Sequence, residues 1–390
     1  RLHPVPRPGT GSRRMSDCAR AACGRCEGPP ERLDVAGRIF VWPPVGHSLG
    51  KLARGLANGR RPFERRGADG CLVLEVGPAE ASSAAAGLAA MLTGEEARAT
   101  RALFVPGRGE PGLADFPRVA TLDRVVAAGR GAWVAELLTE NRLTSHFQPI
   151  VHAGDPSRVF AHEALLRGVE PDGTLIPPAR IFEAAREADI VFQVDLAARR
   201  TAIASAVRQG IATPIFVNFT PTSVYDPAFC LRSTVAVVEA AGIAPSDVVF
   251  EVIESDRAVD VSHLKRILDF YRANGFRVAL DDVGAGYSSL NLVHELRPDI
   301  IKLDMELTCE VHADAYKALI VRKLLEVSDE LGIETVAEGV ERDEDYRWLR
   351  DHGATYVQGF LFGVPGPSPK SARSVIPATP ARASRARPTR

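Results

Sequence analysis

Cysteine is scarce and unevenly placed in this chain of 390 residues. Its six cysteines, three of them near the N-terminus, do not form the dense disulfide framework of a small secreted domain, and we expect a reduced, cytoplasmic setting. Long apolar runs are also lacking, so the pattern predicts no membrane-spanning helix. The first residues are rich in Pro and Arg and lack the apolar centre of a secretory signal. A net charge of −1 excludes an overall field that would attract a nucleic-acid polymer or a membrane surface.

Composition divides the chain into four stretches. Residues 1–34 and 367–390 are rich in Pro, Ala and Arg, and we expect both to be disordered because they cannot bury enough apolar surface to offset the entropy of ordering. The basic C-terminal stretch is expected to be a solvated tail, with weak contact to a polyanion as the alternative. Met15 is a candidate for the natural start of translation. Residues 35–130 alternate short strand and helix patterns, which predicts a small α/β domain.

A larger domain is expected over residues 136–366. Eight short apolar runs predict strands, and they are "HFQPIV", "VFAHEALL", "PIFVNF", "VVFEVI", "RVALDD", "IIKLD", "ETVAEGV" and "ATYVQGF". Amphipathic stretches lie between most of them; in "SHLKRILDFYRANG", Ser262 can cap the N-terminus and Asn274-Gly275 can end the helix in a left-handed turn. Strand–helix units repeated in this way favour a TIM-like (β/α)₈ barrel.

Polar residues interrupt these apolar runs at or near the C-terminal end of each run. They are Glu163, Asn218, Glu251, Asp281, Asp282, Lys302, Asp304, Glu338, Glu341 and Gln358. In a barrel these ends converge on one face, where active sites are built. So many carboxylates repel one another unless cations neutralise them, and Lys302 alone cannot do so. The all-oxygen ligand set favours two Mg²⁺ or Mn²⁺ ions.

Two divalent ions side by side activate water and hold the oxygens of an in-line displacement at phosphorus, which predicts phosphoester hydrolysis. Two alternatives exist on the same fold. Lys302 could form a Schiff base with a carbonyl substrate, or it could act as the base of a metal-dependent enolase-type site. The excess of acids argues against the Schiff base, whereas the spacing of the residues leaves the enolase-type site open.

The segment "HEALLR" resembles the E-A-L-L-R signature of the EAL-domain phosphodiesterases. The blocks "FQPIV", "VNFTP", "FEVIES", "ALDDVGAGYSSL", "IKLD", "AEGVE" and "QGFLFG" follow the order of the family between residues 143 and 365. The resemblance implies an irregular barrel with one strand antiparallel to the rest. It also implies a bacterial cytoplasmic enzyme that hydrolyses cyclic di-GMP to linear pGpG, works with Mg²⁺ or Mn²⁺, and forms a homodimer through this domain.

The resemblance also implies a role for each matching position. The first metal would be held by Glu163, Asn218, Glu251 and Asp281, and Asp282 would help to hold the second. The catalytic positions would be Lys302, which positions water or stabilises developing charge, Glu338, a general base or second-metal ligand, and Glu254, which tethers the loop from Asp282 to Leu290 and couples metal occupancy to dimer contacts. The substrate would meet Gln148, Leu166 and Arg167, and Gln358 and Glu341 would complete the wall of the site.

The sequence departs from the family pattern in three places. Val283 stands where Phe is usual, which removes an aromatic anchor beneath the following loop, and Ala285 stands where Thr or Ala occurs. Pro365, Pro367 and Pro369 interrupt the segment that usually continues into a final helix. No Gly-Gly-Asp/Glu-Glu-Phe block is present, so no diguanylate cyclase domain is expected. Because every metal and catalytic position is retained, an active enzyme is expected, and a catalytically silent cyclic di-GMP receptor is the alternative.

The N-terminal cysteines have the spacing of metal ligands. Cys18, Cys23 and Cys26 could supply three ligands of a zinc or iron–sulfur site, with a fourth from His47 or Cys71. The alternative is three free thiols. A bound metal would make the first 130 or so residues a metal- or redox-responsive module that controls the barrel.

Overall fold

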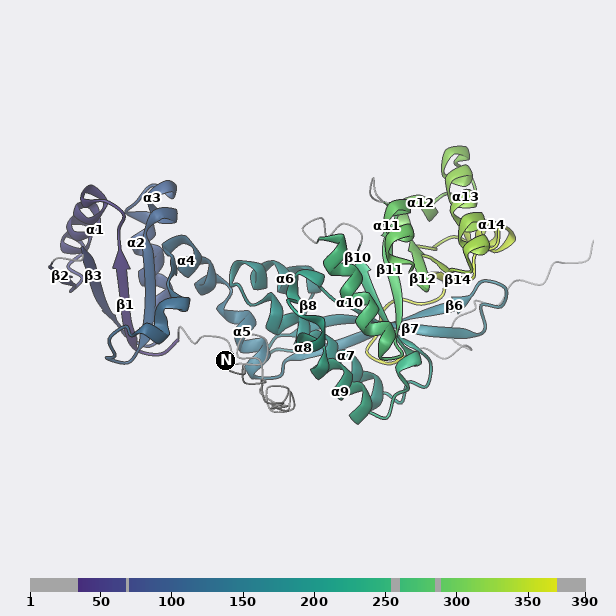
Figure 1. Ribbon diagram of the computed structural model, residues 1–390, viewed down its shortest axis with the longest axis horizontal. Helices are drawn as coiled ribbons and strands as arrows, with labels where there is room; N and C mark the ends of the chain where they lie inside the picture. Colours follow the sequence, from purple (N-terminus) through teal and green to yellow (C-terminus); the bar gives the residue numbers. More distant parts are fainter. Residues whose placement is uncertain (1–33, 68–69, 254–259, 285–288, 370–390) are drawn as a thin grey trace, which may run out of the picture.

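The computed structural model describes residues 34–67, 70–253, 260–284 and 289–369. The N-terminal cysteines, Glu254 and Ala285 lie outside these residues, and the expectations for them stay predictions. Two units follow one another along the chain, a small α/β unit at one end of the molecule and a barrel at the other (Figure 1). Within the described residues, no helix is both long enough and apolar enough to cross a membrane.

The N-terminal unit is an antiparallel sheet of five strands in the order β2-β3-β1-β4-β5. Its strands are β1 (Gly37–Trp42), β2 (Glu64–Arg66), β3 (Cys71–Val76), β4 (Arg101–Pro106) and β5 (Ala120–Thr121), and its helices are α1 (Gly46–Asn58), α2 (Ala81–Ala90), α3 (Gly94–Ala99) and α4 (Leu122–Arg130), with a 3₁₀ turn at Leu113–Arg118. Leu52 and Leu56 of α1 pack with Ile39 and Val41, which alternate along β1. The α/β character predicted for this part of the chain is confirmed.

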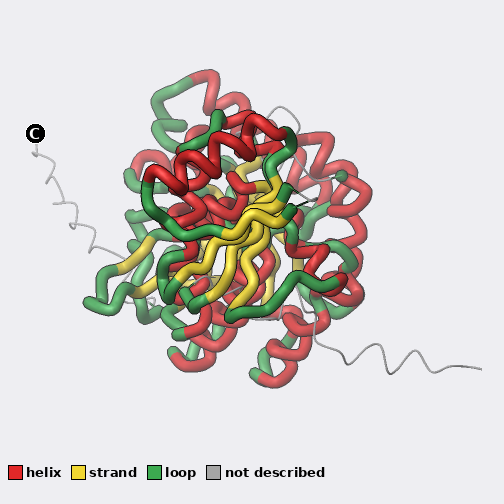
Figure 2. The backbone as a smooth tube through the Cα atoms, turned by 90° about the vertical axis from the view of Figure 1, so that its left-hand side faces the viewer, coloured by secondary structure: helices red, strands yellow, loops and turns green. Residues whose placement is uncertain are grey.

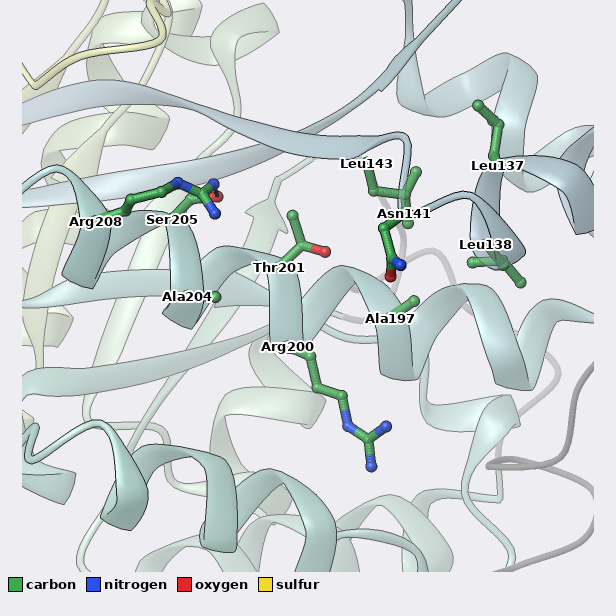
Figure 3. Close-up of a pocket in the computed structure, with 10 residues that line it drawn as sticks. All are labelled: Leu137, Leu138, Asn141, Leu143, Ala197, Arg200, Thr201, Ala204, Ser205 and Arg208. Atoms are coloured by element: carbon green, nitrogen blue, oxygen red, sulfur yellow. Dashed lines mark hydrogen bonds between the residues drawn. The ribbon is translucent and has the colours of Figure 1, made fainter.

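Helix α5 (Ala132–Thr139) connects the two units and belongs to the core of the barrel side. Its residues Val134 and Leu137 share an apolar cluster with Leu166 and Ile181. On the other side of Leu137, a cavity of about 250 Å³ separates the end of α5 from a barrel helix (Figure 3). It is lined by Leu137, Leu138, Asn141, Leu143, Ala197, Arg200, Thr201, Ala204, Ser205 and Arg208. The connecting helix is therefore well packed on one side and loosely packed on the other.

Eight strands close the barrel in the order β6-β14-β13-β12-β11-β10-β9-β7, and β7 pairs back with β6. They are β6 (Leu143–His152), β7 (Val159–Val169), β9 (Ile215–Asn218), β10 (Val248–Ile253), β11 (Arg277–Val283), β12 (Ile300–Leu303), β13 (Glu334–Ala337) and β14 (Tyr356–Gln358), with β8 (Leu175–Ile176) beside β7. Only β6 runs antiparallel to both neighbours, and the other ring pairings are parallel. The TIM-like barrel with one antiparallel strand is thus confirmed.

Figure 2, viewed from the end of the molecule that carries the N-terminal unit, shows helices in red around strands in yellow. The helices of the barrel pack against its strands. They are α6 (Pro178–Glu187), α7 (Val191–Arg208), α8 (Pro227–Cys230), α9 (Arg232–Ala240), α10 (Val261–Ala273), α11 (Ser289–Leu296), α12 (Met305–Thr308), α13 (Ala315–Leu331) and α14 (Asp343–Asp351), with 3₁₀ turns at Pro221–Ser223 and Pro245–Asp247. Parallel strands covered on both faces bury nearly every side chain, which explains why the strand sequences are almost continuously apolar.

One local expectation is wrong and two agree with the structure. The cap of α10 is Asp260 rather than Ser262, because the Asp260 carboxylate accepts hydrogen bonds from both the amide and the hydroxyl of Ser262. Gly275, with φ of +84°, supplies the expected left-handed end of that helix. No final helix occurs between residue 359 and residue 369, where the described chain stops; instead Gly366 pairs with Phe147 of β6.

Candidate active site

One layer of side chains fills the middle of the barrel, with one residue from each ring strand. This layer is Ile150, Ala161, Phe216, Val249, Ala279, Ile300, Val336 and Tyr356. Residues two apart on a strand point to the same face. On each parallel strand, or just beyond its end, a polar residue follows the apolar one by two positions. These residues are Glu163, Asn218, Glu251, Asp281, Lys302, Glu338 and Gln358. On the antiparallel β6, Gln148 lies two positions before Ile150. The next layer of the barrel is therefore polar.

Lys302 lies at the centre of this polar layer. Its ammonium nitrogen is 2.6 Å from Glu338, 2.8 Å from Glu251, 3.3 Å from Asp281 and 3.6 Å from Glu163. The Lys302 side chain is only 1% exposed, so this cluster is held together in a low-dielectric environment. One ammonium group faces four carboxylates, and the layer is short of positive charge.

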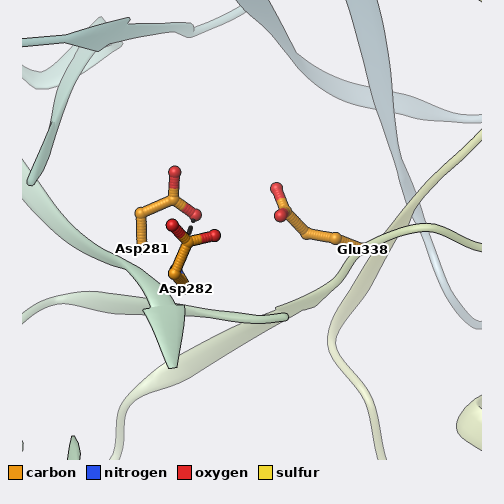
Figure 4. A group of neighbouring side chains, drawn as sticks. All are labelled: Asp281, Asp282 and Glu338. Atoms are coloured by element: carbon orange, nitrogen blue, oxygen red, sulfur yellow. Dashed lines mark hydrogen bonds between the residues drawn. The ribbon is translucent and has the colours of Figure 1, made fainter. Parts of the chain in front are cut away.

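The adjacent Asp281 and Asp282 reach the same site because strand β11 is distorted there. The register between β11 and β12 shifts between Leu280 and Val283. Asp282 has φ of +56°, the left-handed region that residues other than glycine rarely adopt. This conformation turns both carboxylates toward Glu338 (Figure 4), and one oxygen of each of these three residues lies within 4.8 Å of the others. The strained residue at this point is a sign of function rather than of packing.

Several carboxyl groups at the site have raised pKa values. Burial, together with the nearby Asp281 and Asp304, raises the pKa of Asp282 from 3.8 to about 6. Burial also raises the pKa of Glu338 to about 8 and that of Glu251 well above its ordinary value, despite the ammonium of Lys302. The carboxylates in turn raise the pKa of Lys302 well above 10.5, because together they outweigh the effect of burial. Without further cations the site therefore retains protons at neutral pH.

The donor chemistry of the layer fits divalent metal ions. Asp281, Asp282 and Glu338 offer three carboxylate oxygens close together, the ligand type that Mg²⁺ and Mn²⁺ prefer. Oε2 of Glu251 is buried and accepts no hydrogen bond from any described residue. A buried anionic oxygen without a donor is costly, and a cation beside it would remove that cost. The acidic cluster can hold a metal ion.

Two glutamines connect the metal-type residues to the antiparallel strand. Gln358 donates from Nε2 to Glu163 at 2.6 Å and to Gln148 at 3.3 Å, and Gln148 donates to the carbonyl of Gly363 at 3.2 Å. Asn218 donates to the other oxygen of Glu163 at 3.1 Å. Glu163 is thus held by amide groups on both sides.

The remaining predicted substrate residues lie farther from this layer. Leu166 is buried in the apolar cluster that includes α5, and it faces away from Glu163 because it is three positions along the strand. Burial lowers the pKa of the half-buried Arg167, which also feels the charge of Glu163. Glu341 is exposed in the segment between β13 and α14.

We expect the stabilisation of the fold by Mg²⁺ to grow with pH. A carboxyl group with a raised folded-state pKa contributes stability while it is protonated, so the metal-free protein loses the contributions of Asp282 and Glu338 as the pH rises from about 4 through 6 to 8. Mg²⁺ binds the ionised groups and offsets the repulsion over the same range. The increase in Tm on adding Mg²⁺ should therefore be larger at about pH 8 than at about pH 5.5. An equal increase at both values would contradict this prediction.

Comparison with known proteins identifies the family of the barrel. The family model described as EAL domain matches residues 132–365, which is more than half of the chain. The chain belongs to the EAL domain family. It is 31% identical over 238 residues to the probable cyclic di-GMP phosphodiesterase PdeG of Escherichia coli, covering 58% of this chain and 45% of that protein. It is 31% identical over 240 residues to the cyclic di-GMP phosphodiesterase PdeB of Shewanella oneidensis, covering 60% of this chain and 28% of that protein. The chain thus spans less than half the length of these relatives.

Solved EAL structures match the barrel. A standalone versatile EAL protein from Vibrio cholerae O395, in its c-di-GMP-bound form, is 34% identical with a TM-score of 0.55 and covers 59% of this chain and 94% of that chain. The PaMucR phosphodiesterase in complex with c-di-GMP is 28% identical with a TM-score of 0.53, and the match covers 61% of this chain and 97% of that one. Both matches cover about three fifths of this chain and nearly the whole of the solved EAL chain.

Sequence reasoning assigned no role to two acids that the structure places near the site. Asp304 caps α12 by accepting a hydrogen bond from the amide of Glu306 at 2.5 Å, and it contributes to the raised pKa of Asp282. Asp195, on the helix α7, is buried and accepts a hydrogen bond from the amide of Thr220, two residues beyond Asn218. The only sequence signal for Asp195 is an acid on an otherwise apolar side of a helix, which is also the pattern of a structural ion pair.

Proposed function

We propose that the EAL domain of this chain hydrolyses cyclic di-GMP to linear pGpG with two divalent metal ions. The observation that carries the proposal is the complete layer of oxygen ligands around the buried Lys302. The names of the relatives and the c-di-GMP complexes of the matching structures supply the substrate. We assign the first metal to Glu163, Asn218, Glu251 and Asp281, and we assign the second to Asp281, Asp282 and Glu338.

Bound Mg²⁺ or Mn²⁺ would supply Lewis-acid activation of water and of the phosphoryl oxygens. The residues of the chain would do the rest. Lys302, kept protonated by its carboxylate neighbours, offers a fixed positive charge to the negative charge that develops on the phosphodiester. Glu338, 2.6 Å from the ammonium of Lys302, would hold the second metal ion together with Asp281 and Asp282. Gln148 and Gln358 keep Glu163 oriented through amide hydrogen bonds.

The state of Lys302 argues against the two carbonyl-type alternatives. A Schiff base or a proton abstraction needs a neutral amine. The pKa of Lys302 lies well above its ordinary value, because four carboxylates face it in a buried site. In the metal-free site the amine is therefore held protonated, which suits electrostatic stabilisation of a phosphodiester.

A turnover assay tests the proposed activity directly. Purified protein incubated with cyclic di-GMP and Mn²⁺ should yield pGpG by chromatography, and no product should form when the metal is chelated. Equilibrium binding of cyclic di-GMP without any product would instead support the silent receptor. Product that forms unchanged in the presence of excess chelator would refute the metal mechanism.

We also propose that the EAL domain forms a homodimer through α13. Five apolar side chains are exposed along one stripe of this helix, and they are Tyr316, Leu319, Ile320, Val327 and Leu331. They fall within about 120° of helix circumference, an arc that they share with the exposed Lys323 and Glu330, and a largely apolar helix face of this kind can pack on a partner. A soluble surface rarely exposes such a stripe without covering it.

The variant Ile320→Glu should weaken this dimer. An interface residue of this kind contributes about 2 kcal/mol, which is roughly 30-fold in Kd. Light scattering after size-exclusion chromatography should show a shift toward monomer at low micromolar concentration. The control Val207→Glu changes a similarly exposed apolar residue on α7 and should leave the assembly unchanged. A monomeric wild-type protein, or an unaltered dimer in Ile320→Glu, would exclude α13 as the interface.

We further propose that the N-terminal unit regulates the barrel through α4 and α5. Arg124 of α4 pairs with Asp189, just beyond α6, at 3.0 Å, and Gly131 lies so close to Ala184 that an added Cβ would approach its carbonyl to 2.7 Å. Helix α5 then continues the contact to β7, the strand that carries Glu163. A comparison of turnover by the full chain and by the barrel alone would show whether the N-terminal unit activates or inhibits the barrel.

A further inference from the structure

A buried polar network lies behind strand β9, outside the carboxylate layer. Its centre is Asp195 of α7, whose side chain is 2% exposed. One of its oxygens accepts a hydrogen bond from the backbone amide of Thr220 at 2.7 Å. The other accepts from the hydroxyl of Ser223 at 2.8 Å and from Arg199 at 2.7 Å. The hydroxyl of Ser223 also lies 2.6 Å from the carbonyl of Thr220, to which it can donate instead. A buried carboxylate that meets three donors has a well-determined geometry.

The network holds the chain immediately after Asn218. Asn218 is the last residue of β9, and the next two backbone amides are both fixed from outside the loop. The amide of Phe219 donates to the carbonyl of Glu251 on β10 at 3.2 Å, and the amide of Thr220 donates to Asp195. The 3₁₀ turn at Pro221–Ser223 follows at once, and its last residue returns to the same carboxylate. The backbone just after Asn218 is thus hydrogen-bonded to β10 through Phe219 and to α7 through Thr220.

We propose that Asp195 is a positioning residue for the metal site. By fixing Thr220 it sets the carboxamide of Asn218, whose nitrogen is held by Glu163, so that the amide oxygen is available to a divalent ion. The inference rests on the proposed function, because it concerns a ligand of the proposed first metal. It goes further by assigning part of the metal affinity to a helix that does not touch the metal. Outer-shell partners of this kind change metal affinity about 10- to 100-fold.

The variant Asp195→Asn isolates this effect because it keeps the shape of the side chain. The amide oxygen of the new residue will turn to Arg199, which is charged, and its NH₂ group will then face the amide of Thr220. Because both groups are hydrogen-bond donors, the bond that holds the loop at Thr220 is lost. We expect calorimetry to show Mg²⁺ binding weakened about 10- to 100-fold. We also expect hydrogen exchange at the amide of Thr220 to accelerate in the metal-free protein.

The matched control is Thr234→Val. Arg199 donates to the hydroxyl of Thr234 at 2.6 Å on the side of the network that faces α9, away from the loop. This variant also loses a buried hydrogen bond and should lower Tm, but it leaves the contact of Asp195 with Thr220 intact. Mg²⁺ affinity and exchange at Thr220 should therefore stay at wild-type values. A role that is merely structural would move Tm in both variants and metal affinity in neither.

A milder variant covers the case in which Asp195→Asn does not fold. Ser223→Ala removes one donor to Asp195 and should weaken Mg²⁺ binding by about fivefold, the effect of one hydrogen bond. Wild-type Mg²⁺ affinity in both Asp195→Asn and Ser223→Ala would overturn the inference while leaving the proposed function intact. A wild-type protein that binds no Mg²⁺ would overturn both.

Discussion

Replacing Glu163 by alanine should lower the turnover of cyclic di-GMP by about 10³-fold or more, because a metal ion supplies several kcal/mol of transition-state stabilisation and each 1.4 kcal/mol is a factor of ten. Glu163 contacts Asn218, Gln358 and Lys302, so its loss affects the metal ligands and the buried cation together. Chromatographic detection of pGpG over a range of Mn²⁺ concentrations measures the effect. High Mn²⁺ should restore little activity, since a ligand is missing rather than misplaced.

The control for this variant is Glu170→Ala. Glu170 is the first residue after β7, the strand that carries Glu163. Its carboxylate is partly exposed and lies 3.8 Å from the guanidinium of Arg142. Loss of this carboxylate should change turnover by less than about twofold, because exposed ion pairs contribute about 0–1 kcal/mol and this one is outside the polar layer. Retention of more than a tenth of wild-type activity in Glu163→Ala would contradict its assignment as a metal ligand.

Replacing Lys302 by methionine should destabilise the metal-free protein by about 3–5 kcal/mol, the usual cost of removing one partner from a buried ionic cluster. The four carboxyl groups that face Lys302 would then lose their shared cation, and those that are ionised would repel one another or take up further protons. Urea unfolding in the presence of chelator measures this loss. Added Mg²⁺ should recover part of it, because the ion supplies positive charge to the same group of oxygens. Turnover should remain low even in the stabilised protein, since the fixed ammonium is gone.

Lys265→Met is the corresponding control. Lys265 pairs with Asp269 at 2.7 Å on the exposed side of α10, with both side chains about half exposed. Its replacement should change the free energy of unfolding by no more than about 0.5 kcal/mol. A metal-free Lys302→Met protein as stable as this control would show that the carboxylates are neutralised by protons alone.

The sequence predicted the barrel and its polar layer because both follow from a period of two residues. The interior layer from Ile150 to Tyr356 and the polar layer above it differ by two positions on every ring strand. In a regular strand, residues two positions apart point to the same face, so the sequence spacing is enough to place both layers inside the barrel. Because β6 is antiparallel, Gln148 precedes rather than follows its apolar partner by two positions. The family resemblance predicts an antiparallel strand, whereas the apolar pattern alone does not reveal strand direction.

Other features could not be read from the sequence because they depend on tertiary contacts. The left-handed conformation of Asp282 is unfavourable locally, and only the bulge against β12 explains it. Asp195 has the sequence pattern of any buried helical acid until its contact with Thr220 is known. The cap of α10 was misplaced by two residues because Asp260 and Ser262 are both good capping residues, and the spacing does not choose between them.

The apolar cluster between α5 and β7 has a practical consequence for dissecting the chain. An expressed fragment that begins at residue 136 would lack Val134, which packs in the same cluster as Leu166 and Ile181. The truncation would leave an exposed apolar cavity against β7, the strand that carries Glu163 and Arg167. Low activity or precipitation of such a fragment would then reflect a damaged barrel and would be mistaken for loss of an activating signal. A start at residue 132 retains the whole of α5 and makes the comparison between full chain and barrel a fair one.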